Sequence, residues 1–434
     1  MNCNWKEFRL GDLTTWASGS TPSKQNPSFW GGEIPWISGT VMRSKNLSDS
    51  DLYLTQEGLE NKGKLCKKDS ILLLVRGDLF KRIPIGIATK SLCFNQDIKA
   101  INSVSNNLLQ HYIYYLLEGN KKRLSNIVEF TGLGAGKLDT KLLQNLTFKI
   151  PPIHYQKNVI KLIDSIDCKI ELNRENNKNL EEIAKALFKS WFIDFDPVKA
   201  KAEGLSTGLP HGISDLFPDS FEESELGNIP ENWAYKNIGD VFETILGGTP
   251  SRKNSEYWEG NIPWIGSGMV NEFRVIKETE FITELGLVKS STKLLPKRST
   301  LIAITGATLG QISINEIEVC TNQSVVAIKP CKEISPEYVF LWVQKNVNYL
   351  INSQTGGAQQ HINKNNVNEM KILLPNRKIM EIFGNIVKPI FDKISINLFE
   401  SETLSNLRDQ MLPKLISGEI RISDAEKMID EVGI

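Results

Sequence analysis

One segment of the chain is written twice, and this repetition constrains the fold more than any other feature. Residues 19–37 read GSTPSKQNPSFWGGEIPWI and residues 247–265 read GGTPSRKNSEYWEGNIPWI, with eleven of nineteen positions identical. Further matches continue along the chain at an offset that drifts slightly, as insertions and deletions in loops produce. The chain is therefore a tandem duplication with a unit of about 225 residues.

Each repeat begins with a mixed part and ends with a helical part. In the mixed part, short β-rich runs lie between Gly, Pro and Asn residues. In the helical part, the apolar residues follow a helical period instead. These changes predict a first mixed domain over 1–152, a central helical region with an acidic linker over 153–230, a second mixed domain over 231–375, and a distal helical region with a tail over 376–434.

Both helical parts carry apolar residues at alternating steps of three and four, which is the heptad pattern of a coiled coil. Each seam is apolar at its ends and polar at its centre. An antiparallel pair places Asn177 opposite Asn397, and Asn173 opposite Ser401, so that the polar layers meet. A parallel pair would also align them, but the chain must return after a long connector, which favours the antiparallel pair. The predicted pairing residues are Ile163, Ile166, Ile170, Asn173, Asn177, Leu180, Ile390, Ile394, Asn397, Ser401, Leu404 and Met411.

The predicted fold is α+β. It consists of two tandem mixed α/β domains separated by two long helices, which form an antiparallel coiled coil with pseudo-two-fold symmetry. A helix from Ile163 to Trp191 would be roughly 42 Å long at the usual rise per residue. That length is a little more than one turn of B-DNA, about 34–36 Å.

Composition excludes several classes of protein. The 51 Lys and Arg balance the 51 Asp and Glu, and this excludes a uniformly basic coat but not a local basic groove. No run approaches the roughly 18–20 apolar residues of a membrane span, and the N-terminus lacks the apolar region of a secretory signal. Six scattered cysteines and four histidines give no zinc spacing. These features predict a cytoplasmic protein without a membrane or metal partner.

Motifs for catalysis are incomplete throughout. The glycine-rich residues 132–137 lack the spacing of a phosphate-binding loop, and residues 97–99 supply only the last element of a nuclease site. The acids in residues 194–197 follow the end of a predicted helix, and no tetrapeptide of the adenine-methylase type is present. The sequence therefore predicts a chain that is not an enzyme and binds no cofactor of its own.

Signals for nucleic-acid binding are stronger. Residues 62–90 hold eight bases against two acids, which suits phosphate contacts, although a solvated charged face would look the same. The repeated tryptophans could stack on bases, but the Ile-Pro-Trp-Ile alternation favours anchoring in the core. Arg, Lys and Gln in the repeated loops can pair with phosphates and base edges. The candidate DNA-binding residues are Thr21, Ser23, Lys24, Arg43, Arg76, Lys81, Arg82, Gln96, Lys137, Thr249, Ser251, Arg252, Lys253, Arg274, Gln323, Gln359, Gln360 and His361.

Taken together, four motifs resemble the specificity subunit of type I restriction-modification enzymes. The first is the twice-used Gly-x-Thr-Pro-Ser…Trp-x-x-x-Ile-Pro-Trp-Ile segment. The others are ALFKSWFIDFDP at residues 186–197, LGNIPENW at 226–233 and LPKLISGEI at 412–420. The likeness covers essentially the full chain in family order.

This resemblance implies the function. Each mixed domain would be a target-recognition domain reading one half of a split, asymmetric site in double-stranded DNA. Two methyltransferase subunits would dock on the helices and restriction subunits would join them, so that the complex uses S-adenosylmethionine, ATP and Mg²⁺. Because the domains share only part of their residues, we expect two different half-sites.

Two alternatives remain open at this point. The chain could be the recognition half of a self-sufficient restriction-methylation enzyme, against which the missing methylase motifs argue. It could also be a duplicated module for a ligand other than DNA. Salt dependence separates this last class, since DNA affinity falls steeply with added salt.

Overall fold

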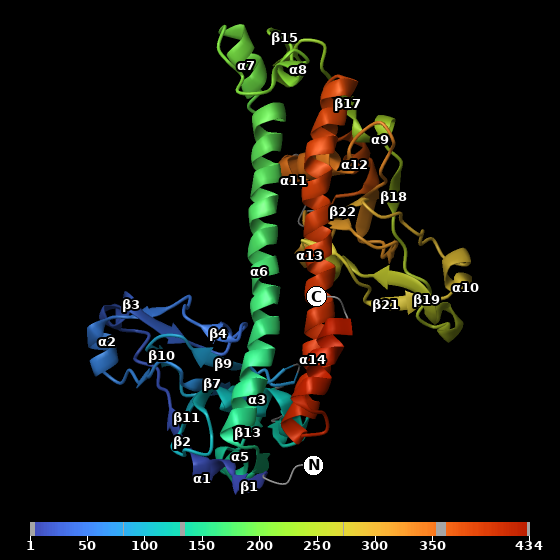
Figure 1. Ribbon diagram of the computed structural model, residues 1–434. Helices are drawn as coiled ribbons and strands as arrows, with labels where there is room; N and C mark the ends of the chain where they lie inside the picture. The colour runs from blue at the N-terminus through green and yellow to red at the C-terminus, as the bar shows by residue number, and fades with distance from the viewer. Residues whose placement is uncertain (1–4, 81, 131–134, 272, 353–361, 432–434) are drawn as a thin grey trace. The chain divides into compact units, whose positions relative to one another are not determined.

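The chain divides into two compact units, each of which contains one mixed domain and one half of each long helix (Figure 1). Unit 1 comprises Met1–Glu171 and Glu400–Ile434, and unit 2 comprises Leu172–Phe399. Among the described residues, no helix has the length and apolar character needed to cross a bilayer. The structure, a computed structural model, describes residues 5–80, 82–130, 135–271, 273–352 and 362–431.

The domain of unit 1 is built on a five-stranded sheet of order β2-β11-β7-β9-β4. Its central strand β7 (Ile71–Leu74) is buried throughout, because an unbroken apolar run suits a strand covered on both faces. Helix α3 (Gln110–Gly119) packs against this sheet, and its six consecutive residues from Tyr112 are buried in the same core. The other strands of the sheet are β2 (Thr14–Ser18), β4 (Asn46–Leu47), β9 (Ile85–Ala88) and β11 (Ile98–Ser103).

A four-stranded sheet of order β5-β3-β10-β6 contains the first copy of the repeated segment. Strand β3 (Trp30–Ile37) runs parallel to β10 (Leu92–Phe94), and Trp36 is buried beside Cys93. The anchoring role predicted for this tryptophan is therefore confirmed. The remaining elements of the domain are β1 (Lys6–Arg9), α1 (Leu10–Leu13), η1 (Pro27–Phe29), β5 (Tyr53–Leu54), α2 (Gln56–Glu60), β6 (Leu65–Cys66), β8 (Arg76–Gly77), α4 (Lys121–Ser125), β12 (Val128–Phe130), β13 (Gly136–Leu138), α5 (Thr140–Asn145) and β14 (Thr147–Ile150).

Unit 2 repeats the strand order of the five-stranded sheet, while its smaller sheet, β21-β19-β24, has three strands where that of unit 1 has four. Its five-stranded sheet has the order β18-β25-β22-β23-β20, and β19 runs parallel to β24 as β3 runs parallel to β10. The duplication predicted from the sequence is thus present in the fold. The sheet strands are β18 (Thr244–Leu246), β20 (Arg274–Val275), β22 (Thr300–Ala303), β23 (Ile312–Asn315) and β25 (Val325–Ile328).

Further elements of unit 2 surround this sheet. Helix α11 begins at Pro336, and the Ser335 hydroxyl accepts a hydrogen bond from the Tyr338 amide. The further elements of unit 2 are β17 (Ala234–Asn237), α9 (Ile238–Val241), η2 (Ser255–Tyr257), β19 (Trp258–Ile265), η3 (Ser267–Asn271), β21 (Glu280–Ile282), α10 (Glu284–Val288), η4 (Gly306–Thr308), β24 (Cys320–Thr321), α11 (Pro336–Asn352), α12 (Lys364–Glu369) and β26 (Lys371–Leu374).

The long helices α6 (Ile153–Phe192) and α13 (Arg377–Ser417) pair antiparallel within each unit. In unit 1 the Tyr155 hydroxyl donates to the Leu415 carbonyl at 3.1 Å. In unit 2 the Asn397 amide donates to Asn177 Oδ1 at 2.8 Å, while Asn173 donates to the Asn397 carbonyl. The predicted antiparallel pairing is confirmed, with the asparagines buried in the seam as expected. Of the other predicted pairing residues, Ile163, Ile166, Ile394, Leu404 and Met411 are buried, and Ile170, Leu180, Ile390 and Ser401 are half-buried.

The acidic segment that follows α6 is folded against the end of that helix. Trp191 packs edge-on against Phe217 with ring centroids 5.1 Å apart, and Lys201 donates to the Phe217 carbonyl. Packing between aromatic rings holds the segment in place, and short elements make up the rest of it. These are α7 (Asp196–Ala202), α8 (His211–Ser214), β15 (Phe221–Ser224) and β16 (Gly227–Pro230), while α14 (Ile422–Glu431) follows α13 in unit 1.

Candidate DNA-recognition surface

The repeated loop places a threonine against a glutamine in both units. Thr21 donates to Gln96 Oε1 at 2.6 Å, and Thr249 donates to Gln323 Oε1 at the same distance. The loop reaches the glutamine because Gly19 approaches the backbone closely: a Cβ there would lie 2.1 Å from the Phe94 carbonyl oxygen. Four predicted residues thus form two equivalent pairs. In each pair the threonine orients an exposed amide, a group that can read base edges.

In unit 1 this glutamine lies in a basic hollow of about 490 Å³. Arg76, Gln96 and Lys137, which the sequence suggested separately, all line it. Lys99 and Lys141 line it too, so four bases face two acids, Asp97 and Asp139. A concave surface with this excess of positive charge suits contacts to DNA phosphates.

Strand pairing explains why these residues meet. The short strands β8 and β13 are antiparallel, and their register sets Arg76 directly opposite Lys137. Lys99 comes from β11 and donates to the Ser18 hydroxyl on β2. Three strands that are distant in the sequence therefore bring basic side chains together in the hollow.

One acid of the hollow, Asp139, is held by the backbone, while the Asp97 carboxylate accepts a hydrogen bond from the Asn95 side chain. Asp139 caps α5, and its carboxylate accepts hydrogen bonds from the backbone amides of Lys141 and Leu142. These hydrogen bonds lower the pKa of the Asp139 carboxyl, since they favour its charged form. Asn363 caps α12 in the same way, so the helix that corresponds to α5 begins with an equivalent side-chain cap in unit 2.

Arg43 and Arg82 lie elsewhere. Both line a second hollow of unit 1, about 560 Å³ in volume, together with Lys45 and Arg408. Lys45 pairs there with Asp164 at 2.5 Å and with Asp167 at 2.8 Å. The structure therefore separates Arg43 and Arg82 from Arg76, Gln96 and Lys137, which line a different hollow.

Tryptophans support the cationic side chains of both repeated loops. In unit 1, Lys24 lies 5.6 Å from the Trp36 ring centroid. In unit 2, Arg252 lies 3.6 Å from the Trp258 ring centroid and forms two hydrogen bonds to Glu280. These hydrogen bonds lower the pKa of Glu280. The neighbouring predicted residues Ser23, Ser251 and Lys253 are exposed.

The prediction for Arg274 is wrong. Its side chain is fully buried and is ion-paired with Glu316, while its guanidinium lies 4.2 Å from the Phe391 ring centroid. A group enclosed in this way is not available to DNA. It fastens the domain to α13 within unit 2. Burial lowers the pKa of Arg274, and the Glu316 carboxylate opposes this effect.

Several predicted residues lie outside the described part of the chain. These are Lys81, Gln359, Gln360 and His361. The glycine-rich residues 132–134 also lie outside it, whereas Gly136 and Lys137 are described.

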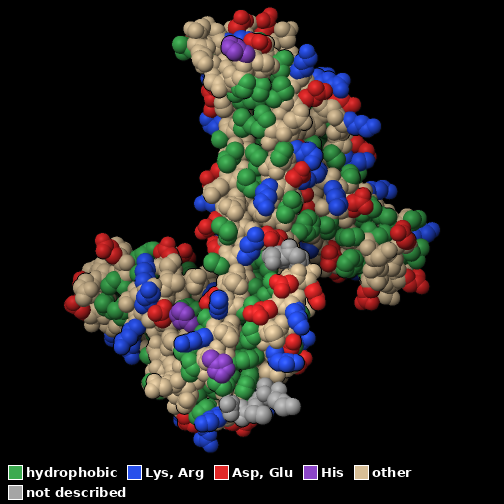
Figure 2. Space-filling view, viewed as in Figure 1, with side chains coloured by type: hydrophobic (Ala, Val, Ile, Leu, Met, Phe, Trp, Pro, Cys, Tyr) green, Lys and Arg blue, Asp and Glu red, His purple; other side chains and the backbone are tan. Residues whose placement is uncertain are grey.

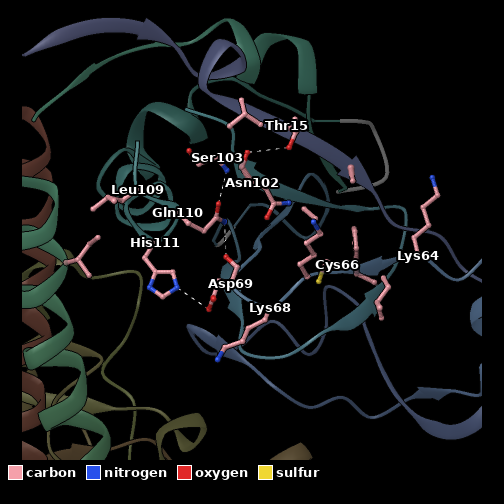
Figure 3. Close-up of a pocket in the computed structure, with 17 residues that line it drawn as sticks. Thr15, Lys64, Cys66, Lys68, Asp69, Asn102, Ser103, Leu109, Gln110 and His111 are labelled. Carbon is pink, nitrogen blue, oxygen red and sulfur yellow. Dashed lines mark hydrogen bonds and ion pairs between the residues drawn. The ribbon is translucent and has the colours of Figure 1, made fainter. Parts of the chain in front are cut away.

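A larger hollow of about 1010 Å³ opens on unit 1 beside the start of α3 (Figure 3). Three lysines of the basic stretch line it, namely Lys64, Lys67 and Lys68. His111 points toward Asp69 and lies 3.2 Å from its carboxylate, as the dashed line in Figure 3 marks. The basic stretch is therefore split, because Arg76 and Arg82 line other hollows.

Sequence reasoning missed two bases of the smaller hollow. Lys99 was considered only as part of a nuclease-like triplet, and Lys141 lies in the first turn of α5. The alternation of β11, where Lys99 lies between buried Ile98 and Ala100, is the signal that could have assigned Lys99 to a surface.

Charge is otherwise mixed. Figure 2 shows Lys and Arg side chains interspersed with Asp and Glu over the visible face, in keeping with the balanced composition. Within the described ranges, no group of three His, Cys, Asp or Glu residues could hold a metal ion. The geometry is thus that of a duplicated protein that presents exposed glutamine amides, with Lys and Arg side chains beside one of them, and these groups suit nucleic-acid contacts.

The model of the type I restriction modification DNA specificity domain matches the chain twice, over residues 2–182 and 230–404. The chain therefore belongs to this family and carries two copies of its domain. It is a DNA-specificity subunit, a class of protein that recognises DNA without catalysing a reaction.

Full-length relatives agree with this assignment. The chain is 27% identical to the type I restriction enzyme HindI specificity subunit of Haemophilus influenzae, over 96% of this chain and 100% of that protein. It is 25% identical to the MjaIX specificity subunit of Methanocaldococcus jannaschii, over 97% and 94%. Its fold is similar to the S subunit of a type I restriction-modification system from M. genitalium, with a TM-score of 0.57, 18% identity, and 95% and 96% coverage.

Proposed function

We propose that the two mixed domains read two different half-sites of one bipartite, asymmetric DNA sequence. The observation that carries this proposal is the repeated threonine–glutamine pair, 2.6 Å in both units, within unlike surroundings. Glutamine pairs with adenine through its amide, and arginine or lysine pairs with guanine. A shared frame with different neighbours fits two readers of different sequence.

The neighbours differ at matching strand positions. Arg76 stands two residues after β7, and Thr305 stands two residues after β22. Lys99 is the second residue of β11, whereas Val326 is the second residue of β25. The half-site read by unit 1 should therefore depend more on cationic contacts.

Partners follow from the family. In this proposal two methyltransferase subunits dock on the helical regions and restriction subunits join the assembly in the cytoplasm. S-adenosylmethionine, ATP and Mg²⁺ act in those subunits, which leaves this chain the task of choosing the DNA. The names of the relatives, which are specificity subunits of type I restriction enzymes, support this arrangement.

The paired helices would set the number of unspecified base pairs between the half-sites. Both helices contribute to both units, and α6 alone has 40 residues, or about 60 Å of helix. Inserting one heptad into each helix should lengthen the spacer and leave both half-sites unchanged. Methylated-base sequencing reads both, and an unchanged spacer would contradict this role of the helices.

Co-expression of the chain with its neighbouring methyltransferase genes tests the main proposal. Mapping of methylated adenines should give one interrupted, asymmetric motif that disappears when this chain is omitted. A palindromic or uninterrupted motif would overturn the assignment of different half-sites to the two domains.

A further inference from the structure

Two aromatic rings stand exposed at one edge of the unit 1 surface. The Phe80 side chain is 77% exposed, the highest value among the large hydrophobic residues that the structure describes, and Phe130 is 54% exposed. Their rings meet edge-on, with centroids 5.7 Å apart. Exposed apolar side chains held together in this way mark a contact surface more often than isolated ones do.

Phe130 has a structural role that Phe80 does not share. The strand register sets Phe130 opposite Gly136. A Cβ on that glycine would lie 2.8 Å from Leu79 Cβ and 3.4 Å from a ring carbon of Phe130, so the ring covers the bare backbone. Folding thus explains the position of Phe130, whereas the contact with the Phe130 ring is the one ring contact that the described residues give Phe80.

The ring pair is continuous with the basic hollow. Strands β12, β13 and β8 form one small sheet, and Lys137 lies next to Gly136 and opposite Arg76. Phe80 follows Arg76 by four residues, beyond a turn in which the Leu79 amide donates to the Gly77 carbonyl. Two exposed acids, Asp78 and Glu129, also lie here, and Glu129 faces Lys137 across the strands.

We propose that Phe80, supported by Phe130, is an apolar wedge that enters between two stacked base pairs in the half-site read by unit 1. This inference rests on the proposed function. The Lys and Arg side chains of the hollow attract the phosphate backbone to this edge. Phenylalanine is among the residues that proteins insert between base steps. The occupant is therefore duplex DNA rather than a protein surface.

Among the described residues of unit 2, no apolar side chain matches Phe80 as a wedge. The residue at the position of Phe80 is Leu309, which is half-buried and packs against the core of unit 2. Unstacking should consequently occur in one half-site only. This asymmetry gives the proposal a control within the same complex.

The experiment uses the complete methyltransferase complex and its mapped duplex, with 2-aminopurine placed in turn along each half-site except at the methylated adenines, which a methyltransferase itself extrudes. Stacking quenches this base, so we expect a severalfold rise in fluorescence at one step of the unit 1 half-site and none in the other. Phe80→Ala should abolish the rise and weaken DNA binding about tenfold, which is the scale of one lost base–aromatic contact. Phe80→Leu, which keeps an apolar side chain, should retain part of the signal.

Val288→Ala is the matched control, because Val288 is 75% exposed in unit 2 and should change neither signal. A wild-type complex that methylates its site without any fluorescence rise would overturn the wedge alone. So would Phe80→Ala with an unchanged rise, or a Phe80→Ala chain that fails to assemble with its methyltransferase subunits, which would make the pair a protein contact. A wild-type complex that does not bind the duplex would overturn the proposed function and the wedge with it.

Discussion

The two units share their frame and differ in their charges. Asp69 and Arg298 occupy the same turn before the central strand, and both have left-handed φ values, 69° and 66°. The backbone amide of each donates a hydrogen bond of 2.7 Å to a carbonyl of the neighbouring strand. Asp69 faces His111 there, whereas Arg298 faces Glu337, so an acid occupies the turn in unit 1 and a base occupies it in unit 2. The fold requires the turn but not the sign of the charge, which leaves each unit free to change its partners.

The units are also fastened to the helices differently. In unit 1, the Lys45 side chain is 18% exposed and lies between Asp164 and Asp167 of α6, which are 45% and 20% exposed. In unit 2, Arg298 bridges Glu316 and Asp392 of α13, beside the fully buried Arg274. Because removing the partner of a fully buried charge costs more than removing the partner of a partly exposed one, the same kind of substitution should affect the two units unequally.

Removing the buried carboxylate should have the largest effect. Glu316→Gln leaves Arg274 buried without its counter-ion, and we expect a loss of about 3–5 kcal/mol in the free energy of unfolding. Lys45→Met in unit 1 should cost about 1 kcal/mol or less. Urea unfolding followed by tryptophan fluorescence measures both, and equal losses would contradict the difference drawn between the units.

Lys99→Ala should have an intermediate effect, on DNA binding rather than stability. Removing one phosphate contact should lower the slope of log affinity against log salt by about one. Lys90→Ala is the control, since Lys90 is exposed and lies outside the hollow. Titration of the complex with its duplex at several salt concentrations gives the slopes. A decrease of the same size for Lys90→Ala would remove the special role of the hollow.

The smallest expected effect concerns the repeated loop. The hydrogen bonds from Arg252 lower the pKa of Glu280, so their contribution to stability is present above the ordinary pKa of a glutamate and is lost as the pH falls through the lowered value. The pair is exposed, so Glu280→Gln should cost less than about 1 kcal/mol at neutral pH and nothing in acid.

Unit 1 has Leu52 where unit 2 has Glu280, and its loop should lack this dependence on pH. Unfolding curves for wild type and Glu280→Gln, compared at acidic and neutral pH, test the point. A difference that persists in acid would mean that the carboxylate stabilises the loop in another way.

Two sequence patterns, the internal repeat and the heptads, predicted the features of the fold that depend on them. The repeat gave the duplicated fold, and the heptads gave the meeting of Asn177 with Asn397. Arg274 was misassigned because the residue that neutralises it, Glu316, lies 42 positions away and no local signal links the two. The convergence of Arg76, Gln96 and Lys137 likewise depends on strand register, which a single sequence does not specify.

The central claim is that each domain reads its own half-site through its own glutamine. Mapping of methylated adenines in cells that carry Gln96→Ala or Gln323→Ala tests it directly. We predict that each variant relaxes the sequence requirement in one half of the motif, a different half for each, and leaves the spacer unchanged. Relaxation of the same half by both variants, or of neither half, would contradict the account.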